Sequence, residues 1–162
     1  MLRDDHNGCG STVFCWPENT VFFRNGAEAP AGELPLLSSV EWAFIHLCEH
    51  NLQDFISALP GLLCGRSNRK TVIVSSPRLI PLAAYVGLNT QTIHAVIRSD
   101  TPLSDVRETL VRVAKGEMPE ISSRLCTGFT DADFRNLCIH FGPPHPARYA
   151  SGGAASRSGF YL

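Results

Sequence analysis

Residues 94–117 read HAVIRSDTPLSDVRETLVRVAKGE, and this stretch decides the fold. An apolar run predicts a buried strand, and a polar turn with a proline follows it. Apolar residues then recur at helical spacing, which predicts an amphipathic helix that ends at Gly116. Pro102 fits the first helical turn, with Asp100 or Thr101 as the cap. The predicted buried stripe consists of Leu103, Val106, Leu110 and Val113.

The preceding chain repeats this alternation of strand and helix. It predicts strands at 40–47, 71–76 and 92–97 and helices at 51–63 and 77–88. Asn51 is the expected cap of the first helix, and Gly87 the expected end of the second. Strands that read as buried on both faces predict an α/β fold with a doubly wound parallel sheet. Its carboxyl-edge residues, which we expect to converge, are His46–His50, Ser75–Ser76 and Arg98–Ser99.

Composition and charge limit the classes of protein to which this chain can belong. The 162 residues are 44% hydrophobic and 18% charged, which indicates a globular chain. The net charge of −1 excludes a protein held on nucleic acid by bulk charge alone. Residues 1–39 are broken by glycine and proline into short β-rich pieces. Six scattered cysteines and a polar N-terminus predict a cytoplasmic protein without a membrane span.

Three stretches resemble a known domain. AFIHLCEHNLQDFISALPGLL (43–63), TVIVSSP (71–77) and residues 94–117 are similar to the last three strands and helices of bacterial response-regulator receivers. The resemblance is to the LuxR/FixJ-type family, in its RcsA/RcsB-like branch. It implies a CheY-like, flavodoxin-like architecture for residues 1–118, with a partial helical appendage at the C-terminal end.

The resemblance also implies roles for individual residues. His46 falls at the phosphoacceptor position, Ser75 at the switch-hydroxyl position and Arg98 at the position of the conserved lysine. Asp4 and Asp5 match the acidic pair that binds Mg²⁺ in this family. Aspartyl phosphorylation needs a carboxylate, which histidine lacks, and arginine presents a planar fork where lysine presents a point charge. We therefore expect a degenerate receiver that does not use the phosphorylation switch.

A degenerate receiver implies a regulator that works by contact with other proteins. We expect a non-enzymatic transcription regulator that pairs with another response regulator or with itself. It should need no cofactor, metal, membrane or small-molecule substrate. The expected partner face consists of Arg98, Asp100, Arg107 and Arg112.

Beyond the receiver-like part, the resemblance covers one more helix. Residues 119–128 are the expected linker, and FTDADFRNLCIHF (129–141) resembles the first helix of a LuxR-type helix-turn-helix domain. Thr130 is its expected cap, with Asp133 at the third helical position. Its apolar face consists of Phe134, Leu137, Cys138 and Phe141. Residues 142–162 show no helical period for a recognition helix, so we expect a flexible tail and weak or indirect DNA contact.

Three other functions stay open at this point. Residues 127–162 are the candidate segment for sequence-specific DNA binding. A small α/β enzyme would need His46 and Ser75 within hydrogen-bond reach in a concave pocket. A metal site would use His46, Cys48 and His50, which alternate at the end of one strand.

Overall fold

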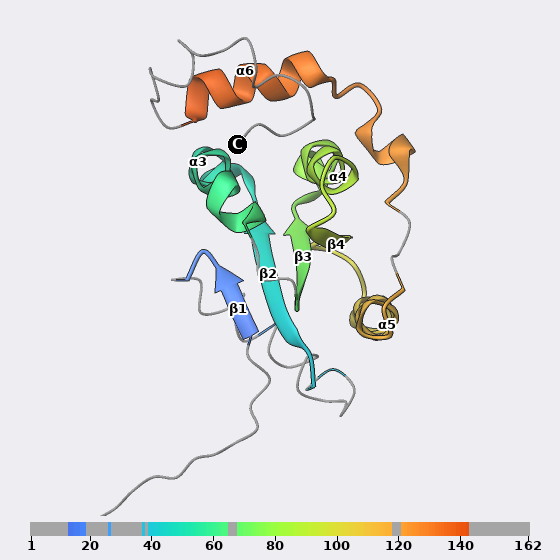
Figure 1. Cartoon of the computed structure of the whole chain (residues 1–162). Helices are drawn as coiled ribbons and strands as arrows, with labels where there is room; N and C mark the ends of the chain where they lie inside the picture. The colour runs from blue at the N-terminus through green and yellow to red at the C-terminus, as the bar shows by residue number, and fades with distance from the viewer. Residues whose placement is uncertain are drawn as a thin grey trace, which may run out of the picture.

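A four-stranded parallel sheet forms the centre of the structure (Figure 1). The structure is a computed structural model that describes residues 13–18, 26, 37, 39–64, 68–117 and 121–142. Its strands, in sheet order, are β1 (Val13–Trp16), β2 (Glu41–Leu47), β3 (Arg69–Ser75) and β4 (Ile93–Arg98). Every neighbouring pair is parallel. The three strands predicted from residue 40 onward are confirmed with nearly the predicted bounds.

Helices cover both faces of this sheet. The α-helices are α3 (Leu52–Leu63), α4 (Ile80–Leu88), α5 (Leu103–Ala114) and α6 (Asp131–Phe141). Short 3₁₀ helices are η1 (Glu49–Asn51), η2 (Pro77–Leu79) and η3 (Ser123–Cys126). Figure 1 shows α3 and α4 on one face, α5 on the other, and α6 lying across α3 and α4. The predicted doubly wound α/β fold, receiver-like in architecture, is confirmed.

The alternation of side chains along the strands divides the core into two clusters. On β2, Ile45 and Leu47 pack with α3 and α4, whereas Trp42 and Phe44 lie in the cluster that contains Leu110 of α5. All five side chains are almost completely buried. Because successive residues of a strand point to opposite faces, strands between two helical layers must be apolar throughout. This explains the uninterrupted apolar runs in the sequence.

The two ends of α5 differ in how well the sequence predicted them. Gly116 has a φ of +85°, and its N–H donates to the Val113 carbonyl at 3.0 Å, so the predicted glycine C-cap is confirmed. The predicted cap at Asp100 or Thr101 is wrong, because Pro102 occupies the N-cap position and no side chain caps the helix. Leu103, predicted to be buried, is 50% exposed.

The predicted ends of α3 and α4 are confirmed only in part. Asn51 occupies the predicted N-cap position of α3, but its side chain makes no cap bond to the helix. Gly87 does not end α4, which continues to Leu88; it is a buried residue inside the helix. A Cβ atom on Gly87 would lie 2.6 Å from the Cδ1 atom of Ile121. Glycine therefore allows the segment that precedes η3 to pack closely on α4.

Candidate functional site

The carboxyl ends of β2, β3 and β4 meet at one edge of the sheet. Leu47 pairs with Ser75, and Ser75 pairs with Arg98. The Ser76 N–H donates to the Leu47 carbonyl at 2.8 Å, and the Ser99 N–H donates to the Ser75 carbonyl at 2.8 Å. The strand ends therefore converge as the sequence predicted.

His46 does not share a face of the sheet with Ser75. It pairs with Val74, which packs with the α5-side cluster, and it follows Trp42 and Phe44 in the alternation of β2. Ser75 occupies the register position of Leu47, which belongs to the α3–α4 cluster. Desolvation by burial lowers the pKa of His46, so the imidazole is neutral at physiological pH.

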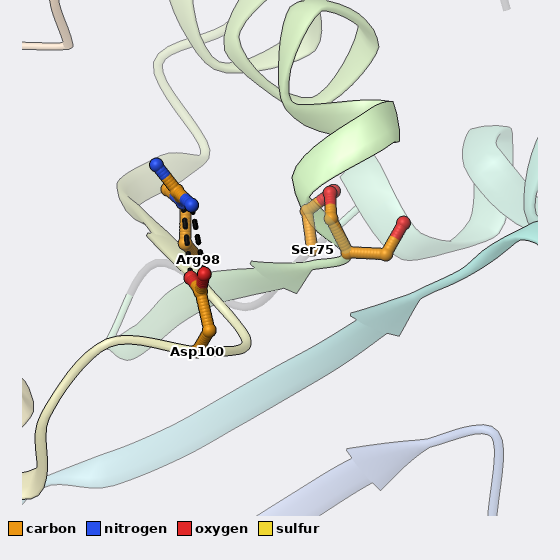
Figure 2. A network of polar contacts seen from close by, with 4 residues as sticks. Ser75, Arg98 and Asp100 are labelled. Carbon is orange, nitrogen blue, oxygen red and sulfur yellow. Dashed lines mark hydrogen bonds and ion pairs between the residues drawn. The ribbon is translucent and has the colours of Figure 1, made fainter.

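Arg98 is held by a residue of its own turn. Its Nε donates to Asp100 Oδ1 at 3.0 Å, and its Nη2 donates to Asp100 Oδ2 at 2.7 Å. Figure 2 shows both contacts, with Ser75 on the neighbouring strand. The hydrogen bond and charge of Arg98 lower the pKa of the Asp100 carboxyl. Both side chains are more than half exposed, so this charge pair lies on the surface of the strand-end edge.

The hydroxyl of Ser75 is engaged locally. The Ser75 side chain is fully buried, and its Oγ donates to the carbonyl of Ser76 at 3.0 Å. A switch hydroxyl must be able to reorient towards a phosphoryl oxygen. In this structure the hydroxyl is satisfied by backbone in a buried position.

Sequence reasoning missed Asn51 as a strand-end residue. The buried side chain accepts a hydrogen bond from the Cys48 N–H at 2.9 Å and donates to the His46 carbonyl at 2.8 Å. This amide fixes the turn that leaves β2 and explains why Asn51 does not cap α3. The only sequence signal is an asparagine shortly after a strand, a residue type that often bonds to nearby backbone.

The alternative sites gain no support from the geometry. β2 ends at Leu47, so the strand alternation that would align His46, Cys48 and His50 stops before the last two. Within the part of the chain that the structure describes, no three metal-ligating side chains gather at one point. A cavity of about 270 Å³ is lined by neither His46 nor Ser75. Its lining residues are Phe14, Ala43, Ile45, Gly61, Leu62, Cys64, Arg69 and Thr71.

The predicted partner face carries mainly exposed charges. Arg112 pairs with Glu117 at 3.0 Å, and about half of each side chain is exposed. Arg107 is only partly exposed, although a partner face needs exposed side chains. Leu103 lies at the start of α5, shortly after the Arg98–Asp100 turn. The predicted acidic pair, Asp4 and Asp5, lies outside the described residues.

The fold and the strand-end edge together define a receiver-like α/β domain. The model of the EcpR N-terminal domain family matches residues 3–114, a region that ends at the last residue of α5. The chain therefore belongs to the EcpR N-terminal domain family, and it is a regulator-related protein.

One curated relative supports this assignment. The Vi polysaccharide biosynthesis protein TviA of Salmonella typhi is 26% identical over 103 residues, which cover 63% of this chain and 56% of that protein. The chain thus matches little more than half the length of this relative. No solved structure matches the chain. Among the residues described by the structure, no helix is both long and apolar enough to cross a bilayer.

Proposed function

We propose that this chain is a LuxR/RcsB-like transcription regulator that acts in the cytoplasm by pairing with another response regulator or with itself. In this proposal the chain binds partners and catalyses no reaction. Family membership supports the regulatory class. The mechanism is inferred from the geometry of the strand-end edge. There His46 and Ser75 face opposite sides of the sheet, and Asp100 forms an ion pair with Arg98.

The chemistry of this edge argues against aspartyl phosphorylation. The receiver-equivalent positions carry an imidazole, a hydroxyl and a guanidinium, and none of the three is a carboxylate nucleophile. Mg²⁺ prefers hard oxygen ligands, which a neutral imidazole does not supply. The cation that would neutralise a phosphoryl group is instead neutralised by Asp100.

The surface that follows β4 is the proposed partner face. It presents the Arg98–Asp100 pair, the Arg112–Glu117 pair and exposed Leu103. Exposed ion pairs contribute little to folding stability, so their loss should leave the fold intact. In an interface they supply specificity and association rate, while an apolar side chain such as Leu103 supplies buried area.

Surface variants of the full chain test this proposal. Leu103→Ser and Arg112→Glu should weaken self-association, measured by sedimentation, or capture of a purified response regulator. Ile139→Ser is the matched control, because Ile139 is 65% exposed on α6. Circular dichroism should show the same fold for all three variants. If both α5 variants associate as well as the wild type, or if Ile139→Ser weakens association equally, the proposed face is wrong.

A further inference from the structure

The α3–α4 surface is covered by the C-terminal segment of the described chain. Phe134 of α6 is 5% exposed and lies with its ring centroid 5.1 Å from that of Tyr85 on α4. The ring of Phe129 meets Tyr85 edge-on at 5.3 Å. The rest of the predicted apolar face, Leu137, Cys138 and Phe141, also packs on the α3–α4 cluster. This surface therefore accepts an amphipathic helix that presents apolar side chains at i, i+3, i+4 and i+7.

Two polar contacts hold the ends of α6. At its first residue, Asp131 Oδ1 accepts a hydrogen bond from the Tyr85 hydroxyl at 2.5 Å. At its last residue, the Phe141 carbonyl accepts from Ser57 Oγ of α3 at 2.6 Å. The helix also has its own capping box, in which Thr130 and Asp133 bond reciprocally. It can therefore begin in the right place without help from the sheet.

The attachment of α6 is small compared with that of the other helices. Seven of its eleven residues are exposed, and Phe134 is its one fully buried side chain. By contrast, α4 buries seven residues and lies directly on the sheet. Segments with few buried apolar contacts open at lower free energy than the core strands.

We propose that α6 is a reversible clasp: a helix that binds the α3–α4 surface through Phe134, Tyr85–Asp131 and Ser57–Phe141, and that can dissociate from it. While α6 is bound, no other amphipathic helix can bind this surface. The contact is therefore autoinhibitory, with the chain's own α6 as the occupant. This inference goes beyond the proposed function, because it concerns the face of the sheet opposite to α5.

Hydrogen exchange of the full chain measures opening of the clasp. In the wild type, amides of residues 131–141 should exchange faster than those of β2, β3 and β4. Phe134→Ala should raise exchange in 131–141 by about a hundredfold, and Tyr85→Phe by about tenfold, without a change in the strands. Thr109→Val is the control, because it removes a hydroxyl that bonds within α5, on the opposite face of the sheet. The clasp is refuted if α6 exchanges as slowly as the strands in the wild type, or if both α4–α6 variants raise exchange everywhere equally.

A labelled peptide of residues 127–142 measures access to the closed surface. The tethered α6 competes at high effective concentration, so the wild-type chain should bind the peptide weakly. The Phe134→Ala chain, or the Asp131→Ala chain if the first does not fold, should bind it at least about tenfold more tightly, because each change weakens only the tethered α6. A peptide that carries Phe134→Ala is the matched control. Equal binding of the peptide by the wild-type and variant chains, or equal binding of both peptides, would overturn the proposal.

Discussion

Replacing Asn51 with alanine should destabilise the whole domain through the turn that leaves β2. The substitution removes the acceptor for the Cys48 N–H and the donor to the His46 carbonyl. Asn51 is only 9% exposed, so water does not readily replace either bond. A lost hydrogen bond costs about 1 kcal/mol, and a buried group left without a partner about 1–3 kcal/mol. The free energy of unfolding should therefore fall by about 2–4 kcal/mol.

Urea denaturation followed by tryptophan fluorescence measures this loss, because Trp42 is completely buried in the core. The midpoint should fall while the slope against urea stays unchanged. Asn89→Ala is the matched control: its amide makes one bond, to the Tyr85 carbonyl at 2.9 Å, from an exposed position. That variant should lose less than about 1 kcal/mol. If Asn51→Ala is no less stable than Asn89→Ala, the amide does not hold the strand end.

Two further predictions concern His94 of β4 and Leu110 of α5. His94 Nδ1 accepts from the Thr71 N–H at 3.1 Å, and burial, then Lys70, lowers the pKa of His94 below its ordinary value of 6.5. The folded state thus favours neutral His94, so its contribution is present above pH 6.5 and is lost as pH falls through the lowered pKa. The urea midpoint should drop on acidification, and less so in His94→Gln; equal drops would contradict this assignment. Leu110→Ala, which empties a completely buried position, should cost about 2–5 kcal/mol in the same assay, and a smaller loss would mean that α5 packs loosely.

The sheet was predictable because its signals are local. Strands buried on both faces need continuous apolar runs, and those runs mark β2, β3 and β4 in the sequence. Side-chain caps were predictable only where the capping side chain has no competing partner. Thr130 caps α6 as predicted, whereas Asn51 bonds to the turn after β2 and Asp100 pairs with Arg98.

The candidate site was predictable in its position but not in its geometry. The edge of a parallel sheet follows from the order of its elements, so the convergence of the strand ends could be predicted. The direction of each side chain depends on register, and a shift of one residue moves a side chain to the opposite face. Pairing of Leu47, rather than His46, with Ser75 therefore separates the two predicted site residues.

The surface on which α6 packs could not be predicted from the pattern of apolar residues in the helix. The predictions of its N-cap and of its apolar face are both confirmed. An amphipathic helix, however, does not specify what it packs against, and the resemblance suggested a separate DNA-binding domain. Only the contacts with Tyr85 and Ser57 show that this face is seated on α3 and α4. The assignment of residues 129–141 to a helix-turn-helix domain stays a prediction.

We propose that this chain regulates by protein contact, without a phosphoryl switch. To test this directly, the full chain is incubated with Mg²⁺ and acetyl phosphate. Its mass is then determined by intact-protein mass spectrometry. Its association with itself and with an intact response regulator is measured on the same samples. We expect no added phosphoryl group at any residue, His46 included, and the same association with and without the donor. A covalent phosphoryl group together with a change in association would refute regulation without a phosphoryl switch.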